Sequence, residues 1–292
     1  MRDSENGKYL IDFQFIDKPL IVGGIGLYQI GTKVCDSDTY SPPHRHLNWF
    51  ELTIARSGKG IVTTDGASEN IASGDIYLSF PCDVHSVRSS ADDRLTYSFF
   101  SFYFTDEKYK SVFDDLAMRC DAAKSRVFRN SLLPELVDFL TAEIADGDPA
   151  DNRLVALTLE QLVLLIPKFC AASYTPATTN PKSNEQITFM IMRYLSLNLF
   201  SIENLSQVAD YLGYNYSYLS KIFKKTTGKS ITDYYVSLKM DHAKTLIRDA
   251  GFSVTKTAEI LNYSSVYAFS KAFKNFYGVS PTQADFGNAI IP

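Results

Sequence analysis

The spacing of apolar residues along this chain of 292 residues divides it into regions of different secondary structure. From about residue 10 to residue 105, short runs rich in Ile, Val, Tyr and Phe are separated at regular intervals by Gly, Pro, Asp and Ser. This pattern is typical of an antiparallel β-barrel or β-sandwich. We therefore expect β-strands over 21–30, 50–55, 60–64, 76–80 and 95–104.

After residue 104 the apolar residues recur with helical spacing. Helices are predicted over 133–144 and 154–166, and the second is apolar on nearly every side. One stripe of this second helix could pack against the β-rich region or form a dimer contact, and the sequence leaves both alternatives open. The stripe consists of Val155, Leu159, Leu162 and Ile166. The next stretch, 171–182, is small and polar and contains two prolines, which predicts a linker between domains.

From residue 183 onward the pattern predicts only helices, seven in number, with short connections. Ser183 and Gln186 have the spacing of a capping box in front of the first helix. A second helix is expected over 205–212, with Asn204 at its start and Gly213 in a left-handed cap after its end. The C-terminal region should therefore form an all-α domain.

A pattern of residues recurs in this region at an offset of 50 positions. The run Ser220-Lys221-Ile222-Phe223-Lys224-Lys225 precedes Gly228-Lys229-Ser230, and Ser270-Lys271-Ala272-Phe273-Lys274-Asn275 precedes Gly278-Val279-Ser280. We expect Asn215 to cap the first of these two helices and Ser264 to cap the second, over 265–276. Two copies with the same internal spacing predict two copies of one structural unit. Each copy is a short helix, a turn and a Lys-bearing helix, which is typical of helix-turn-helix DNA binding.

The charge of the chain is unevenly distributed. Its net charge of −4 argues at first against nucleic acid as a partner. However, residues 186–292 contain 11 Lys and Arg against 7 Asp and Glu, whereas the rest of the chain contains 18 against 26. The excess of positive charge is therefore in the predicted helix-turn-helix region, where it favours DNA binding.

Composition and cysteine spacing narrow the class of protein further. A hydrophobic content of 45% and a charged content of 21% are those of an ordinary globular protein. The four cysteines are scattered and form no CxxC pair, which favours reduced thiols over a disulfide framework or a zinc site. We find neither a secretory segment nor an apolar run long enough to span a membrane, and we expect a cytoplasmic location.

The outer face of each predicted Lys-bearing helix carries the candidates for DNA contacts. Lys can donate to guanine, Ser can contact any base edge, and an apolar or aromatic side chain can contact the thymine methyl group. The candidates for base contacts are Tyr216, Ser217, Ser220, Lys221, Ser265, Val266, Tyr267, Ser270 and Lys271. The candidates for phosphate contacts, which lie near the helix ends, are Lys224, Lys225, Lys229 and Lys274. The alternative is that these lysines merely form a solvated face. The same lysine pattern occurs twice at the same offsets, which argues against this alternative.

The segment 205–280 resembles the DNA-binding domain of the AraC/XylS family of bacterial transcription regulators. The matching runs are Val208-Ala209, Leu212-Gly213-Tyr214, 217–225, Gly228-Lys229-Ser230, Ala258-Glu259-Ile260, 269–274 and Gly278-Val279-Ser280-Pro281. The resemblance implies a long central helix over 231–248 and two recognition helices that enter successive major grooves about 34 Å apart. It assigns base contacts to Ser217, Ser220 and Lys221 in the first motif, and to Val266, Tyr267 and Lys271 in the second. Asn262 replaces the usual Gly before the second recognition helix, and Asn can also adopt a left-handed cap.

The N-terminal region resembles the two motifs of the cupin barrel. His44-Arg45-His46 is followed by Glu51 and Gly58, and then by Gly74, Pro81 and His85. In metal-dependent cupins, such His and Glu residues bind one divalent metal ion. Here Asp83 replaces the usual Gly, and His85 is one residue closer to its Pro, so we expect no metal and no cofactor. A metal-dependent cupin enzyme or a metal-sensing regulator is the alternative.

A small-molecule effector in the barrel is the preferred interpretation of the N-terminal motif. Its candidate contacts are His44, Arg45, His46, Trp49, Glu51 and His85. His and Glu can hydrogen-bond a polyol, and Trp49 could stack on a sugar ring or belong equally to the core. Together with the resemblance to sugar-responsive regulators, this favours a sugar or glycoside as the effector.

The sequence thus predicts a multidomain protein. We expect a cupin-like antiparallel β-barrel over 1–105 with flanking helices, a helical segment over 106–170 that could dimerise, a linker over 171–182, and a seven-helix double helix-turn-helix domain over 183–292. The expected function is sequence-specific transcription regulation under control of an effector, not catalysis, because no Ser/His/Asp array, P-loop or dinucleotide fingerprint is found. The expected partners are double-stranded promoter DNA, the effector, a second copy of the chain and, for an activator, RNA polymerase.

Overall fold

The computed structural model describes residues 2–4, 7–15, 18–37, 39–46, 49–81, 83–120, 126–150, 152–172, 183–248 and 252–284. The chain forms two compact units, Met1–Thr178 and Thr179–Pro292, which we call the first and the second unit. Of the predicted linker over 171–182, Ala171 and Ala172 end a helix, and residues 173–182 lie outside the described residues. No described helix is both long and apolar enough to cross a membrane.

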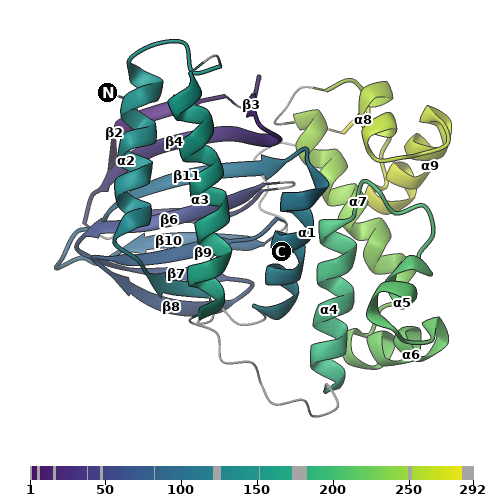
Figure 1. Cartoon of the computed structure of the whole chain (residues 1–292). Helices are drawn as coiled ribbons and strands as arrows, with labels where there is room; N and C mark the ends of the chain where they lie inside the picture. The colour runs from purple at the N-terminus through teal and green to yellow at the C-terminus, as the bar shows by residue number, and fades with distance from the viewer. Residues whose placement is uncertain are drawn as a thin grey trace. The chain divides into compact units, whose positions relative to one another are not determined.

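The first unit is built mainly from antiparallel strands, as predicted (Figure 1). Its larger sheet has eight described strands in the order β1-β2-β4-β11-β6-β9-β12, with β3 paired to β4. These strands are β1 (Arg2–Ser4), β2 (Gly7–Gln14), β3 (Leu20–Val22), β4 (Ile25–Cys35), β6 (Phe50–Ser57), β9 (Asp75–Ser79), β11 (Thr96–Phe104) and β12 (Val127–Arg129). The smaller sheet has the order β5-β10-β7-β8, with β5 (Tyr40–Arg45), β7 (Lys59–Thr64), β8 (Ala67–Ala72) and β10 (Val84–Ser89).

Central strands of the larger sheet are buried on both faces. Successive side chains of a strand point to opposite faces, so Phe50 and Leu52 of β6 share one face, and Glu51 and Ala55 share the other. Ala55 belongs to an apolar cluster together with Val62, Ile71 and Val87 of the smaller sheet, which places this face between the two sheets. Phe50 instead contacts Phe113 of helix α1 (Glu107–Arg119), with ring centroids 5.0 Å apart. The interior between the sheets is therefore where Glu51 lies.

Three helices follow the strands of the first unit. They are α1 (Glu107–Arg119), α2 (Leu132–Ala145) and α3 (Arg153–Ala172). Helices α2 and α3 lie side by side across the larger sheet (Figure 1). The stripe predicted on α3 is almost completely buried within the unit, so of the two alternatives left open, packing on the same chain is correct for this stripe. The opposite side of α3 exposes Leu154, Leu157 and Leu164.

The second unit is all-α, as predicted, with six helices among its described residues. They are α4 (Asn184–Leu197), α5 (Gln207–Leu212), α6 (Tyr216–Thr227), α7 (Ile231–Arg248), α8 (Val254–Ile260) and α9 (Val266–Tyr277). A seventh helix after Pro281 would fall largely on residues 285–292, which lie outside the described residues. The core of α4, α5, α6 and α7 is continuous and includes Ile191, Val208, Phe223 and Leu238.

The helix ends in this unit follow the predicted capping residues with two differences. The capping box of Ser183 and Gln186 is present, and Gly213 adopts the left-handed conformation with φ 70°. Helix α5 begins at Gln207 rather than at 205, because Asn204 accepts a hydrogen bond from the backbone N–H of Ser206 in a turn that precedes the helix.

The second difference concerns the start of α9, where the prediction of Ser264 as the cap is wrong. The side chain of Ser265 accepts a hydrogen bond from the backbone N–H of Ala268, and the helix begins at Val266. Two adjacent serines offer the same capping chemistry, and only the extended backbone of Ser265 directs its oxygen to the first turn. Asn262 has φ 52°, the left-handed conformation expected for the residue that replaces Gly.

Candidate functional site

Helices α6 and α9 are built alike. Each has 12 residues and an N-cap side chain that accepts a hydrogen bond from a backbone N–H. Asn215 accepts it from Ser217 in α6, and Ser265 accepts it from Ala268 in α9. Each ends at a left-handed glycine, Gly228 with φ 74° and Gly278 with φ 79°. Their inner sides are fully or almost fully buried and contain Leu219, Ile222 and Phe223 in α6, and Phe269 and Phe273 in α9. The predicted duplication is thus present in three dimensions, with the same side of each helix in the core.

The candidates for base contacts lie on the opposite side of these two helices. Those that are exposed are Ser217, Lys221, Ser265, Val266, Tyr267 and Lys271. The side chain of Tyr267 is 78% exposed, against 36% for that of its neighbour Val266. Tyr216, Ser220 and Ser270 are half-buried, and Tyr216 packs against the core of the unit. An exposed phenol at the start of α9 has the placement that a base-contacting side chain requires.

The candidates for phosphate contacts, Lys224, Lys225, Lys229 and Lys274, are all exposed. Among the described residues, no carboxylate lies within 4.0 Å of their ammonium groups, or of those of Lys221 and Lys271. Lys256 on α8 differs, because its ammonium group lies 3.3 Å from the carboxylate of Glu259. These lysines, on α6, just after α6 and on α9, therefore present positive charge that no contacting carboxylate neutralises, which suits phosphate binding.

In the first unit, four side chains that are dispersed in the sequence meet between the sheets. His44 on β5 lies directly opposite His85 on β10 in the smaller sheet, and their ring centroids are 4.4 Å apart. His46 lies two residues after His44 and therefore on the same side. Glu51, on β6 of the larger sheet, completes a set in which one ligand atom from each residue lies within 4.8 Å of all the others. We call these four residues the His–Glu cluster.

The carboxylate of Glu51 is the electrostatic centre of the His–Glu cluster. Its oxygens lie 3.2 Å from Nε2 of His46 and 3.5 Å from Nε2 of His85, and Ser101 donates a hydrogen bond to it at 2.9 Å. Burial by itself raises the pKa of Glu51, but the positive charge and close contact of His46 and His85 outweigh it and hold this pKa well below its usual range. Burial lowers the pKa of His85, and contact with Glu51 outweighs that effect and raises it. The cluster therefore favours an ionised carboxylate beside imidazoles.

The departure at Asp83 from the cupin pattern has a structural explanation. The carboxylate of Asp83 accepts a hydrogen bond from the backbone N–H of Phe80 at 2.7 Å and forms a buried ion pair with Arg126. The guanidinium of Arg126 also lies over the ring of Phe80, 4.7 Å from its centroid. Asp83 thus fixes the turn that leads into β10, two residues before His85.

A cavity of about 110 Å³ opens beside the His–Glu cluster. It is lined by Tyr9, Gln29, Lys33, Ser41, His44, His46, Glu51, Val87, Tyr97 and Phe99. Of the predicted effector contacts, His44, His46 and Glu51 belong to this lining, whereas Trp49 and His85 do not. The side chain of Arg45 lies outside the described part of the structure. Trp49 instead packs on His46 and Tyr28, with ring centroids 4.7 and 4.2 Å away.

Five polar residues of the lining were not predicted, namely Tyr9, Gln29, Lys33, Ser41 and Tyr97. Tyr9 comes from β2, and Gln29 and Lys33 come from β4. The side chain of Lys33 is buried, and its ammonium group lies 5.3 Å from the centroid of the Tyr9 ring. The sequence could have indicated two of them. Gln29 and Lys33 are polar residues four positions apart, on one face of an otherwise largely apolar strand.

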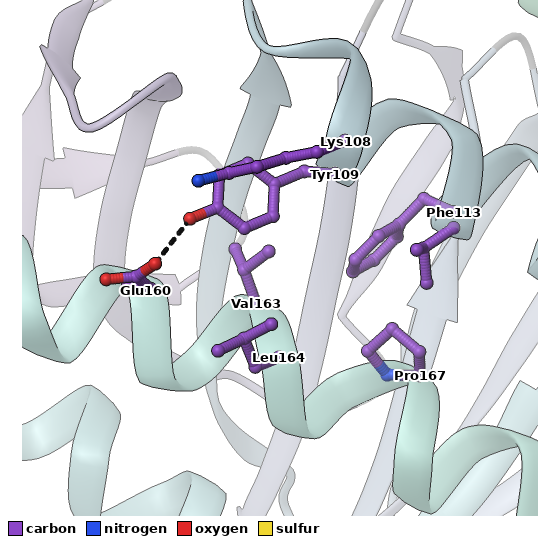
Figure 2. Close-up of a pocket in the computed structure, with 8 residues that line it drawn as sticks. Lys108, Tyr109, Phe113, Glu160, Val163, Leu164 and Pro167 are labelled. Carbon is purple, nitrogen blue, oxygen red and sulfur yellow. Dashed lines mark hydrogen bonds between the residues drawn. The ribbon is translucent and has the colours of Figure 1, made fainter.

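A second cavity, of about 310 Å³, lies between α1 and α3 (Figure 2). Its lining is mostly apolar and consists of Lys108, Tyr109, Val112, Phe113, Glu160, Val163, Leu164 and Pro167. The hydroxyl of Tyr109 donates a hydrogen bond of 2.6 Å to the carboxylate of Glu160 at one end. Its apolar lining does not include any of the predicted effector contacts.

A segment of each unit matches the model of a known protein family. Residues 26–122 match the model of the AraC-like ligand binding domain, and residues 208–285 match the model of a helix-turn-helix domain. The first match runs from β4 past the end of α1 and includes the His–Glu cluster. The second runs from α5 past α9 and includes both helices of the candidate DNA interface.

Individual relatives cover most of the chain at low identity. The Msm operon regulatory protein of Streptococcus mutans serotype c is 23% identical over 257 residues, which cover 87% of this chain and 89% of that protein. The HTH-type transcriptional regulator YidL of Escherichia coli K12 is 22% identical over 280 residues, which cover 91% and 87%. The crystal structure of fatty acid-bound ToxT from Vibrio cholerae strain SCE256 covers 96% of this chain and 95% of that one, at 13% identity. The TM-score of 0.44 indicates that the two structures agree only in part.

Proposed function

This chain belongs to the AraC/XylS family of transcription regulators, and we propose that its second unit binds specific promoter DNA through α6 and α9. The observation that carries the proposal is the duplication of one exposed surface. Both helices present Ser and Lys at the same offsets from their N-caps, and those lysines have no carboxylate within 4.0 Å among the described residues. The family is one of regulators rather than enzymes, in agreement with the prediction.

The proposed base contacts are the exposed residues of the two outer faces. Ser217 and Lys221 would contact base edges from α6, and Val266, Tyr267 and Lys271 would do so from α9. Ser220, Ser265 and Ser270 would support them, and Tyr216 would reach DNA only with the edge of a ring that packs on the core. The proposed phosphate contacts are Lys224, Lys225, Lys229 and Lys274.

Selection from a randomised duplex library with the purified full chain tests this proposal. We expect enrichment of one site with two conserved halves, each about 3–4 base pairs and about one helical turn apart. Binding of the enriched duplex should be at least ~10³-fold tighter than binding of a scrambled duplex at the same salt concentration. A failure to enrich any sequence, or equal affinity for both duplexes, would rule out sequence-specific recognition.

For the first unit we propose that the cavity beside the His–Glu cluster binds a small polar effector. Its lining offers hydrogen-bonding groups of both kinds, including the carboxylate of Glu51, the amide of Gln29 and the ammonium group of Lys33. The hydroxyl groups of a sugar suit these hydrogen-bonding groups, which line a cavity of about 110 Å³. Trp49 would act by supporting His46 rather than by stacking on the ligand.

A thermal-shift panel of monosaccharides, glycosides and small polar acids tests the effector proposal. A ligand that occupies the cavity at 100 times its Kd should stabilise the first unit by ~2.7 kcal/mol. Lys33→Met should abolish that shift, because it removes the donor but keeps the length of the side chain. A shift that survives Lys33→Met would place the ligand elsewhere, for example in the cavity between α1 and α3.

We also propose that a second copy of the chain is a partner, because α3 has an exposed apolar side. Leu154, Leu157 and Leu164 are 48%, 48% and 60% exposed, and Phe139 of α2 is 44% exposed. Replacing Leu157 with Glu should convert a dimer into a monomer in light scattering without loss of helicity. If the protein activates transcription, RNA polymerase is a further partner.

A further inference from the structure

We propose that Asn262 is a positioning residue, which ties the second helix-turn-helix motif to the first and so sets the spacing of the two half-sites that α6 and α9 read together. The first motif is α5, its turn and α6, and the second motif is α8, its turn and α9. The proposal rests on the proposed DNA binding by these helices. It assigns a role to a residue outside the proposed DNA contacts.

The turns of the two motifs have the same backbone arrangement. In each, a left-handed residue precedes a tyrosine whose backbone N–H donates to the carbonyl group five residues earlier, at 3.1 Å in the first motif and 3.0 Å in the second. The left-handed residues are Gly213, with φ 70°, and Asn262, with φ 52°. Glycine adopts this conformation more readily than any other residue. The turn itself therefore does not require asparagine, and the side chain of Asn262 is available for another contact.

That contact joins the two motifs. The side-chain amide of Asn262 donates a hydrogen bond to the backbone carbonyl of Phe200, 62 residues earlier, in the turn that follows α4. The backbone N–H of Asn262 donates to the carbonyl of Glu259 at 3.0 Å, so the turn fixes the direction in which the side chain leaves the backbone. The bond therefore links the turn between α8 and α9 directly to the segment between α4 and α5.

The accepting carbonyl lies in a segment that packs on the core of the first motif. The hydroxyl of Tyr235 on α7 donates to the carbonyl of Leu199 at 3.2 Å, and the ring centroid of Phe200 lies 5.4 Å from that of His242 on α7. Leu199 is completely buried in the same core as Phe223 of α6. The position of Phe200 is thus fixed relative to α6, and the bond from Asn262 extends this restraint to the start of the second recognition helix.

A buried lysine lies at the same junction. The ammonium group of Lys239 on α7 is 4.8 Å from the ring centroid of Tyr235 and 5.0 Å from that of Tyr263. Tyr235 belongs to the core of the first motif, and Tyr263 follows Asn262. A cation within about 6 Å of a ring is attracted over a range of positions, whereas a hydrogen bond needs a directed approach. Lys239 therefore holds the motifs together, and Asn262 adds a restraint on their orientation.

The restraint matters because a duplex presents its half-sites at fixed intervals. Each base pair that is added between two half-sites moves one of them by about 3.4 Å along the axis and by about one tenth of a turn around it. Two recognition helices that are held rigidly cannot follow this change, whereas two that are joined only through α7 can adapt in part. The bond from Asn262 should therefore increase the penalty for a wrong spacing.

Fluorescence anisotropy of the full chain tests the proposal with the selected duplex and with duplexes that have one base pair added or removed between the half-sites. Asn262→Gly keeps the left-handed turn, Asn262→Asp keeps the size of the side chain, and both remove the amide donor. In each variant the ratio of affinities for correct and altered spacing should fall about 2- to 10-fold, the range expected for one hydrogen bond. The affinity for a duplex with a single half-site should not change.

Gly213→Asn is the matched control. It places asparagine at the equivalent turn of the first motif, where a Cβ would meet open space, and should leave the ratio of affinities unchanged. Circular dichroism shows whether each variant is folded. An unchanged ratio in both folded Asn262 variants would overturn the proposal, and so would an equal loss of affinity for every spacing and for the single half-site.

A second measurement does not depend on DNA. Spin labels attached through a bio-orthogonal amino acid at Thr226 of α6 and Asn275 of α9, which are both exposed, report the distribution of distances between the two helices. This distribution should be broader in both Asn262 variants than in the wild-type chain, and an unchanged distribution would overturn the proposal. Equal binding of all duplexes by the wild-type chain would instead refute DNA recognition, and the distance distribution would still decide whether Asn262 ties the two motifs.

Discussion

Lys221 and Lys271 occupy the same position in two different helices. Each lies six residues after the N-cap of its helix, Asn215 for α6 and Ser265 for α9, and each is exposed. Both helices have 12 residues and end at a left-handed glycine. Two lysines in equivalent positions should make equivalent contacts, each with its own half of a DNA site.

Lys221→Ala and Lys271→Ala should each weaken specific binding by ~1–3 kcal/mol and relax base preference in one half of the site only. Fluorescence anisotropy with the selected duplex and with duplexes altered in either half measures both effects. Lys256→Ala is the control, because this lysine is also exposed but is paired with Glu259 on α8. An equal loss on all duplexes would instead identify the two lysines as phosphate contacts.

Lys224→Gln and Lys274→Gln should weaken binding to all duplexes by a similar factor. Each variant removes one phosphate contact, so the slope of log K against log salt should become less steep by about 1. Affinities measured at four or more salt concentrations give this slope. An unchanged slope together with altered base preference would mean that these lysines contact bases.

Ser265→Ala should lower the free energy of unfolding of the second unit by ~0.5–2 kcal/mol, because it removes the cap of α9. Ser264→Ala is the matched control and should have no measurable effect, because the capping bond to Ala268 comes from Ser265. Urea unfolding followed by circular dichroism compares the two. The reverse order of effects would mean that the helix begins one residue earlier.

Cys35 should be almost inert towards iodoacetamide in the folded protein. Burial raises the pKa of its thiol to about 11, so roughly one thousandth is thiolate at pH 8. Because the folded chain holds this proton more tightly than the unfolded chain, the free energy of unfolding should also fall as the pH rises from 9.0 to about 11. Mass spectrometry of Cys35 with and without urea measures the labelling, and rapid labelling without urea would show that the apolar cluster opens.

The helices of the second unit could be predicted from the sequence because local features of the chain determine them. Helix period, capping residues and the 50-residue repeat all lie within short segments, and α6 begins where Asn215 predicts it. The errors are small and have one cause. At Ser264–Ser265 and at Asn204–Ser206, neighbouring residues offer the same capping group, and only the backbone conformation decides which of them is used.

The cavity in the first unit was predicted only in part because pairing across the sheets assembles it. His44 and His46 are visible as a local motif, but Tyr9 and Lys33 reach the cavity through the pairing of β2 with β4. Trp49, in contrast, was predicted as an effector contact but does not line the cavity. Its chemistry suits a sugar ring, yet its contacts with His46 and Tyr28 leave it outside the lining of the cavity. The residue types indicated the chemistry of the site, whereas the pairing of strands that are distant in the sequence determines which residues line it.

The most direct test of DNA recognition by a duplicated helix is a methylation-interference footprint on the selected duplex. Wild-type protein should show two groups of major-groove contacts about 10 base pairs apart on one side of the DNA. Lys221→Ala should remove contacts in one group only, and Lys271→Ala in the other only. A single group of contacts, or loss of the same contacts in both variants, would contradict the assignment of α6 and α9 as two separate recognition helices.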